Sequence, residues 1–176
     1  MDVMVDLETL GNGSNAAIIA IGAVEFDPTT RALGREFYQV VDAQSSVDSG
    51  MAIDASTVMW WMKQNTEAKR AFNTPGTPLF LALGDFANWY PEGANFWGNG
   101  ATFDNVILSN AYKLTSQKRP WPYQADRCYR TLKALFPNVE QVHAGVAHNA
   151  LDDAKSQALH AIKLLSAHYA QQSIAI

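Results

Sequence analysis

The chain has 176 residues, 48% of them apolar, so a packed core is expected and global disorder is excluded. Its formal net charge is −4, which is untypical of a protein that coats long duplex nucleic acid but leaves open an enzyme that binds nucleic acid through metal ions. The single cysteine, Cys128, excludes an internal disulfide and suits a reducing cytoplasm.

The length fits one domain, which we expect to cover residues 1–176. No apolar run approaches the roughly 20 residues that span a bilayer. The first residues, which include Asp2, Asp6 and Glu8, lack the basic and apolar regions of a signal peptide. We therefore expect a cytoplasmic protein with no membrane partner.

The first 41 residues predict three strands. Residues 1–7 and 17–26 are apolar enough to form buried strands, and residues 34–41 alternate well enough for a third. An Asp-Pro-Thr-Thr turn signal at residues 27–30 separates the last two. Residues 17–41 are therefore predicted to form a hairpin.

After this hairpin the apolar residues recur at helical spacing. The expected helices are residues 54–73, with Asp54 or Ser56 as the N-cap, and residues 78–90, 103–114, 126–136 and 151–172. Residues 94–98 are expected to form a short buried strand between two of them. The order of elements predicts layers of helices packed against a sheet.

Acidic residues stand at three places where an expected element begins or ends. Asp6 and Glu8 lie two positions apart on the first strand, so their side chains point to one face and repel each other. A strand gains from this arrangement only where its end holds a divalent cation. Asp104 follows a glycine-rich turn at the start of a helix. Asp153 opens the last helix, five residues after His148.

Each of these sites alone has an ordinary explanation. An acidic residue at a helix start is usually a cap or a partner of the helix dipole, which applies to Asp104 and Asp153 taken singly. We assign that explanation to Asp152, whose side chain should face away from that of its neighbour. We expect His160 and His168 on the surface of the last helix. The weight lies in the combination, because D-x-E, N-x3-F-D and H-x4-D occur in that order.

The combination resembles the DEDDh branch of the DnaQ-like 3'-5' exonuclease superfamily. The stretches DLETLG, FWGNGATFDN and HNALDDA match its three motifs and span nearly the whole chain. The sister branch has a tyrosine four residues before the last aspartate, where this chain has Asn149, so the histidine branch fits. The most similar members are small phage, prophage and mycobacterial exonucleases. The resemblance implies an α/β, RNase H-like fold, in which helices flank a mixed five-stranded sheet with an N-terminal three-strand antiparallel meander.

The resemblance also implies a site for two Mg²⁺ or Mn²⁺ ions, which stabilise charge on the attacking and leaving oxygens of phosphodiester hydrolysis. Its expected ligands are Asp6, Glu8, Asp104 and Asp153. Hard cations prefer oxygen ligands, and four carboxylates balance two divalent charges. Asp6 is the expected bridging ligand because it lies furthest into the strand. By resemblance His148 is the general base, a task suited to imidazole, whose unperturbed pKa lies near 6.5.

An exonuclease that binds a 3' end irrespective of its sequence can hold the terminal base by stacking it on an aromatic side chain. The candidate substrate contacts are Leu10, Gly11, Trp60, Trp61, Gln64 and Phe103. Leu10 and Gly11 match family positions that meet the last nucleotide. One of two adjacent tryptophans on a helix usually belongs to the core, and Phe103 has the same alternative. Basic residues are few and scattered, which predicts a short binding site.

These patterns predict a 3'-5' exonuclease that acts on single-stranded DNA or RNA and releases nucleoside 5'-monophosphates. One alternative is a catalytically silent nucleic-acid or protein-binding module on the same fold, which the complete set of carboxylates and the histidine disfavours. Another is an RNase H-like endonuclease, which the spacing of the histidine disfavours. The sequence leaves the choice of DNA or RNA open. The resemblance suggests the cytoplasm of a bacterium or phage-infected host, with a homodimer as a candidate assembly.

Overall fold

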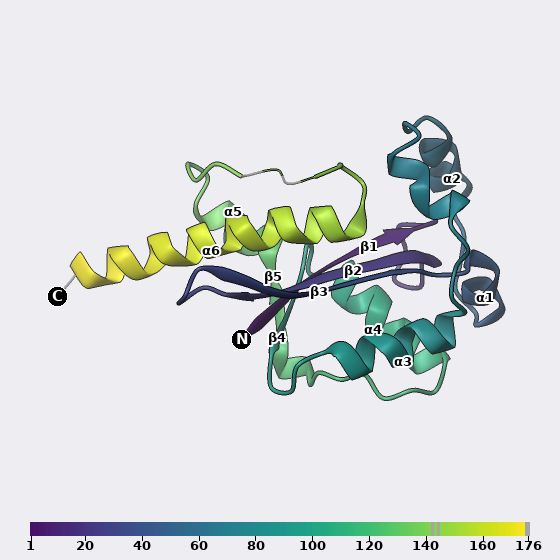
Figure 1. Ribbon diagram of the computed structural model, residues 1–176, viewed down its shortest axis with the longest axis horizontal. Coiled ribbons are helices and arrows are strands. Elements are labelled where there is room, and N and C mark those ends of the chain that lie inside the picture. The colour runs from purple at the N-terminus through teal and green to yellow at the C-terminus, as the bar shows by residue number, and fades with distance from the viewer. Residues whose placement is uncertain (142, 144, 175–176) are drawn as a thin grey trace.

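β1 (Asp2–Thr9) is the central strand of a five-stranded sheet in the computed structural model, which describes residues 1–141, 143 and 145–174 (Figure 1). The other strands are β2 (Ile18–Asp27), β3 (Ala32–Val40), β4 (Asn95–Gly98) and β5 (Asp126–Cys128). In the spatial order β3-β2-β1-β4-β5, the first three strands form an antiparallel meander, and β4 and β5 run parallel to β1. This mixed sheet confirms the predicted fold class.

Helices cover both faces of the sheet (Figure 1). α5 (Tyr129–Leu135) and α6 (Ala150–Ile174) lie on one face, and α3 (Leu79–Trp89) and α4 (Asp104–Leu114) lie on the other. The remaining helical elements are α1 (Ala43–Asp48), α2 (Ala55–Met62) and the 3-10 turns η1 (Ala68–Asn73) and η2 (Tyr123–Ala125). In the described part of the chain, no helix has the length and apolar character needed to cross a membrane.

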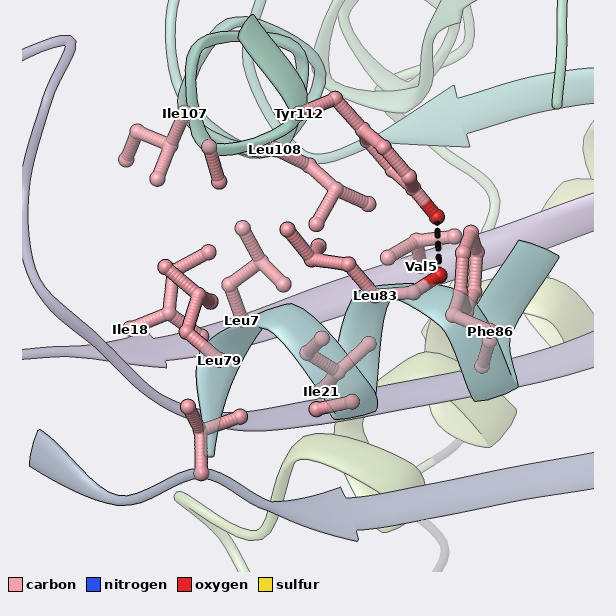
Figure 2. Close-up of a cluster of buried hydrophobic side chains, with 14 of the residues drawn as sticks. Val5, Leu7, Ile18, Ile21, Leu79, Leu83, Phe86, Ile107, Leu108 and Tyr112 are labelled. Atoms are coloured by element: carbon pink, nitrogen blue, oxygen red, sulfur yellow. Dashed lines mark hydrogen bonds between the residues drawn. The ribbon is translucent and has the colours of Figure 1, made fainter. Parts of the chain in front are cut away.

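The side chains of β1 alternate between two cores, as strand geometry requires. Val5 and Leu7 pack with residues of α3 and α4, and Figure 2 shows them facing Leu83 and Leu108 across this core. Met4 points to the opposite face and packs under α6. Asp6 and Glu8 share the face of Met4 because they follow it at even spacing. The alternation therefore turns both carboxylates toward α6.

Gly22 lets the beginning of α6 approach the sheet closely. It pairs with Asp6 across the β1–β2 ladder. A Cβ atom at this position would lie 2.1 Å from the carbonyl carbon of Ala150, the first residue of α6. Any larger residue would therefore push the helix start away from β1. The close approach brings the acidic first turn of α6 to the carboxylates of β1.

The prediction of one continuous helix over 54–73 is wrong. α2 ends at Met62, and the chain resumes as the 3-10 turn η1. The Asn65 side chain accepts a hydrogen bond from the Ala68 amide at 2.8 Å, which competes with helical hydrogen bonding at this point. Asp54 is the N-cap residue, but its side chain accepts the Asn12 amide instead of an amide of α2.

Residues 126–136 also differ from the predicted helix. The first three form the edge strand β5, and α5 begins only at Tyr129. The Cys128 sulfur accepts the Thr131 amide at 3.4 Å and caps this helix. The short helix α1 was not predicted, although Asp42 caps it by accepting the amides of Gln44 and Ser45.

The prediction that His160 lies on the surface is wrong, because its side chain is fully buried. α5 and the segment that follows it cover this side of α6. The ring lies between the Tyr129 hydroxyl and the Val139 carbonyl, at 2.7 and 2.8 Å. His168 is half-buried, with its ring centroid 6.2 Å from that of Phe136.

Candidate active site

Three of the predicted metal ligands converge where β1 meets the start of α6. Asp6 and Glu8 come from β1, and Asp153 comes from the first turn of α6. One carboxylate oxygen from each residue can be chosen so that all three lie within 4.8 Å of one another. Such a cluster of oxygen atoms has the donor type and spacing that a divalent cation requires.

The protein environment opposes the simultaneous ionisation of these carboxylates. Burial, followed by the charges of Asp153 and Asp104, raises the pKa of Glu8 to about 8. Burial is also the main reason that the pKa of Asp6 lies well above its ordinary value. The pKa of Asp153 is raised by burial as well. A bound cation would remove this repulsion.

One oxygen of the cluster has no hydrogen-bond partner in the described part of the chain. Glu8 Oε1 is buried and accepts no hydrogen bond from the described residues. A buried carboxylate oxygen without a partner is costly in the folded state. Together with the three converging carboxylates, this oxygen shows that the residues present fit a metal ion.

Asp104 lies near the cluster but supplies none of its three converging oxygen atoms. It is buried at the start of α4, and its two oxygens accept the amides of Leu7 and Asn99 at 3.2 and 2.7 Å. Burial raises its pKa to about 6, although these hydrogen bonds act in the opposite direction. Its charge raises the pKa values of Asp6 and Glu8. Its role as a fourth ligand stays a prediction.

Gln157 belongs to the site but was not predicted. Its Nε2 donates to Asp6 Oδ1 at 2.7 Å and so orients that carboxylate. Its own Oε1 is buried without a hydrogen-bond partner among the described residues. Gln157 lies four residues after Asp153, one helical turn further along α6. That spacing is the signal by which the sequence could have revealed it.

His148 lies in the turn before α6, beside Asp153. Its backbone has a φ of 64°, in the left-handed region, and its amide donates to Asp153 Oδ2 at 2.9 Å. Its ring stands edge-on to that of Trp60, with centroids 5.0 Å apart. The turn therefore fixes the imidazole and the aspartate relative to each other. Asp152 accepts the Val146 amide at 2.9 Å and so supports the same turn.

A pocket of about 450 Å³ adjoins the acidic cluster. Its lining includes Glu8, Thr9, Trp60, Trp61 and Phe103. Its size and its mixture of aromatic and polar groups are typical of a small-ligand site.

The predicted substrate contacts divide into two groups. Trp60, Trp61 and Phe103 line the pocket, whereas Leu10, Gly11 and Gln64 are not among its lining residues. Leu10 is packed in the core, and Gln64 donates to the carbonyl of Trp60. The assignment of these residues to substrate stays a prediction.

Known proteins share both the sequence pattern and the fold. The model of the family described as "3'-5' exoribonuclease Rv2179c-like domain" matches residues 1–165. The exodeoxyribonuclease of Enterobacteria phage T4 is 26% identical over 125 residues, which cover 61% of this chain and 53% of that protein. The chain therefore spans about half the length of this curated relative.

Solved structures of 3'-exonucleases superpose on most of the chain. A full-length 3'-exonuclease matches with a TM-score of 0.62 and 14% identity, covering 94% of this chain and 81% of its own. The nuclease domain of 3'hExo, a DEDDh family member bound to rAMP, matches with a TM-score of 0.58 and 17% identity, covering 93% and 90%. At these identities the likeness shows the fold, which is RNase H-like. With the family match over residues 1–165, it follows that the chain belongs to the Rv2179c-like 3'-5' exoribonuclease domain family, among the DnaQ-like exonucleases.

Proposed function

We propose that this chain is a metal-dependent 3'-5' exonuclease that removes nucleotides one at a time from single-stranded DNA or RNA. The observation that carries the proposal is the convergence of Asp6, Glu8 and Asp153, together with a buried oxygen of Glu8 that accepts no hydrogen bond from the described residues. In the overall reaction, water adds across the terminal phosphodiester bond. The shortened strand keeps a free 3'-hydroxyl, and the released product is a nucleoside 5'-monophosphate.

We assign the metal site to the four carboxylates Asp6, Glu8, Asp104 and Asp153. Two Mg²⁺ or Mn²⁺ ions bound there would supply charge stabilisation at the attacking and leaving oxygens. Gln157 holds the Asp6 carboxylate in its orientation. Hydrogen bonds from two backbone amides hold the Asp104 carboxylate in place, so the substrate meets a preformed site.

We assign the role of general base to His148. The hydrogen bond from its backbone amide to the Asp153 carboxylate holds the turn beside the acidic cluster. In this assignment the imidazole lies within reach of the water that attacks the scissile phosphate. In this assignment an imidazole nitrogen takes the proton from the attacking water. The leaving oxygen, which becomes the 3'-hydroxyl, takes up a proton from solvent.

We assign the terminal nucleotide to the 450 Å³ pocket. Trp60 and Phe103 offer aromatic surfaces there, and stacking on such surfaces accepts every base. The phage T4 relative is named an exodeoxyribonuclease, and the family is described as an exoribonuclease domain. Both DNA and RNA are therefore tested as substrates. A cytoplasmic location and a homodimer are part of the proposal, to be tested by cell fractionation and by light scattering.

The test uses single-stranded DNA and RNA 20-mers that carry a 5' label, with Mg²⁺, Mn²⁺ or EDTA. A 3'-5' exonuclease gives a ladder of shortened strands and 5'-monophosphates, and EDTA stops it. A single internal product would instead indicate an endonuclease, and no product with either cation would support a silent module.

The variants Asp6→Asn and Asp153→Asn should abolish the ladder while far-ultraviolet circular dichroism stays unchanged. Asp85→Asn is the matched control, because Asp85 is exposed on α3, on the opposite face of the sheet. Full activity of either site variant would contradict the proposal.

A further inference from the structure

The active-site pocket continues along the surface into two further hollows. A hollow of about 710 Å³ shares Asn12 and Phe103 with the active-site pocket. A third, of about 380 Å³, shares Ala101 and Cys128 with the second. Neighbouring hollows share lining residues, so they lie next to one another in a row from the acidic cluster past the turn at Gly100 to β5, and we treat this row as one groove. We call this the arginine groove.

Arg130 stands where the groove leaves the active site. Its side chain is on α5, lines the second hollow and donates from Nη2 to the Asn99 carbonyl at 2.7 Å. Gly100 has a φ of 143°, and a Cβ atom there would lie 3.4 Å from the guanidinium carbon of Arg130. The glycine therefore lets the guanidinium lie against the turn that leads to Asp104.

Two more arginines, Arg119 and Arg127, line the far hollow. Arg127 is exposed and donates to the carbonyls of Gln124 and Asp126 at 2.7 and 2.9 Å. Arg119 donates to Ser109 Oγ and lies 3.7 Å from an Asp126 carboxylate oxygen.

Beyond the active-site pocket the groove is therefore basic, although the chain as a whole is acidic. Its second and third hollows contain three arginines and one aspartate, in a chain of net charge −4. In the described part of the chain, neither Arg127 nor Arg130 forms an ion pair, although the charge of Arg130 lowers the pKa of Asp104. The sequence shows these residues only as scattered charges, and the fold gathers them on one surface.

We propose that the arginine groove binds the sugar-phosphate backbone on the 5' side of the scissile bond, so that strands of several nucleotides bind better than dinucleotides. This inference rests on the proposed exonuclease function and adds a substrate length to it. A guanidinium presents several N–H donors in a fork that matches phosphate oxygens. Tyr123, which is 71% exposed at the far hollow, offers a ring for one more base.

The order of the hollows makes the inference specific. Arg130 is next to the active site and should contact the first phosphates on the 5' side, whereas Arg127 should contact later ones. The test measures KM for a series of single strands from 2 to 12 nucleotides with the wild type, Arg130→Gln and Arg127→Gln. Arg31→Gln is the matched control, because Arg31 lies in the β2–β3 turn, at the end of the sheet opposite the acidic cluster.

We expect the wild-type KM to fall with length and then level off. Each groove variant should raise the KM for the 12-mer by about tenfold, as is typical of a lost hydrogen bond to a charged group. The effect of Arg130→Gln should begin at shorter strands than that of Arg127→Gln. Each lost phosphate contact should also make the slope of log KM against log salt shallower by about 0.7.

The outcome for the groove can be separated from the outcome for catalysis. If the variants raise KM by the same factor at every length, or not at all, the inference is wrong and the exonuclease proposal stands. If the wild type cleaves nothing, the exonuclease proposal fails. The groove is then judged by fluorescence anisotropy of a labelled 12-mer without divalent cation. Equal affinity of the wild type and the Arg127→Gln/Arg130→Gln double variant would overturn the inference.

Discussion

The imidazole of His148 stands edge-on to the indole of Trp60, with the ring centroids 5.0 Å apart and the planes at 90°. Trp60 comes from α2, and its side chain is 41% exposed. Its neighbour Trp61 is only 4% exposed and donates from Nε1 to the Thr9 carbonyl at 2.8 Å. The two tryptophans therefore have different roles. Trp61 anchors α2 to the end of β1, whereas Trp60 lines the pocket beside His148.

If Trp60 stacks on the terminal base, Trp60→Ala should raise KM for a single-stranded 12-mer by between about 5- and 150-fold. Trp60→Phe should keep most of the affinity, since it keeps an aromatic face. Met59→Ala is the control, because Met59 is exposed on the same helix but does not line the pocket. An unchanged KM for Trp60→Ala would exclude the stacking role.

We expect His148→Asn to lower kcat by roughly 10²- to 10⁴-fold, the usual contribution of a general base. Asparagine tolerates the left-handed backbone conformation of His148, so the hydrogen bond from the backbone amide of residue 148 to the Asp153 carboxylate should be kept. Metal binding, measured as the rise in melting temperature with Mn²⁺, should therefore match that of the wild type. A variant with wild-type kcat would show that another group takes the proton.

Metal binding should stabilise the wild type and fail to stabilise Glu8→Gln. A ligand at 100 times its Kd adds about 2.7 kcal/mol to the free energy of unfolding. For a chain of this length that corresponds to a rise in melting temperature of about 5–10 °C. Without metal, Glu8→Gln should be at least as stable as the wild type, because the substitution relieves repulsion inside the cluster.

Asp85→Asn should keep the full metal-induced rise, since Asp85 is exposed on α3, away from the cluster. Differential scanning fluorimetry with and without Mn²⁺ measures both quantities. A wild-type rise in the Glu8→Gln protein would remove Glu8 from the ligand set.

The sequence reveals functional residues most clearly where they are residue types that an ordinary buried strand would not contain. Two carboxylates at even spacing on β1 have no role in a strand, so Asp6 and Glu8 stand out from the residue pattern alone. Strands β1 to β3 are predictable because apolar runs and a turn signal define them locally. Asp104 and Asp153 stand out only as part of an ordered set, because each alone resembles a helix cap.

Features that depend on how distant elements pack could not be predicted in this way. Gln157 reaches Asp6 only because Gly22 lets α6 approach the sheet. β5 has three residues, and only its pairing with β4 distinguishes it from the helix that follows. The burial of His160 likewise depends on α5 and on the segment after it, which cover a second side of α6.

The buried His160 predicts one contribution to the pH dependence of the stability of the fold. Its Nε2 must carry a hydrogen, because the Val139 carbonyl can only accept, and its Nδ1 then accepts from the Tyr129 hydroxyl. Burial lowers the pKa of His160 below its usual value of 6.5, and the charges of Lys133 and Lys163 lower it further, although the Val139 bond acts in the opposite direction. The folded protein therefore holds the neutral ring at a pH where the unfolded chain already binds a proton.

The contribution of His160 to stability should accordingly fall as the pH drops below about 6.5, because its ring then binds more protons in the unfolded state than in the folded state. The carboxylates of the acidic cluster, whose pKa values are raised in the folded protein, act in the opposite direction over this pH range. Urea unfolding at pH 7.5 and 5.5 isolates this contribution as a difference between two proteins. On going from pH 7.5 to 5.5, the free energy of unfolding should change less favourably in the wild type than in His160→Asn. His168→Asn, a change at a half-buried position further along α6, serves as the control and should keep the wild-type difference. Tyr129→Phe should cost about 1–3 kcal/mol at both pH values, since it leaves Nδ1 buried without a donor. An equal pH-dependent change in the free energy of unfolding of the wild type and His160→Asn would show that this imidazole makes no contribution.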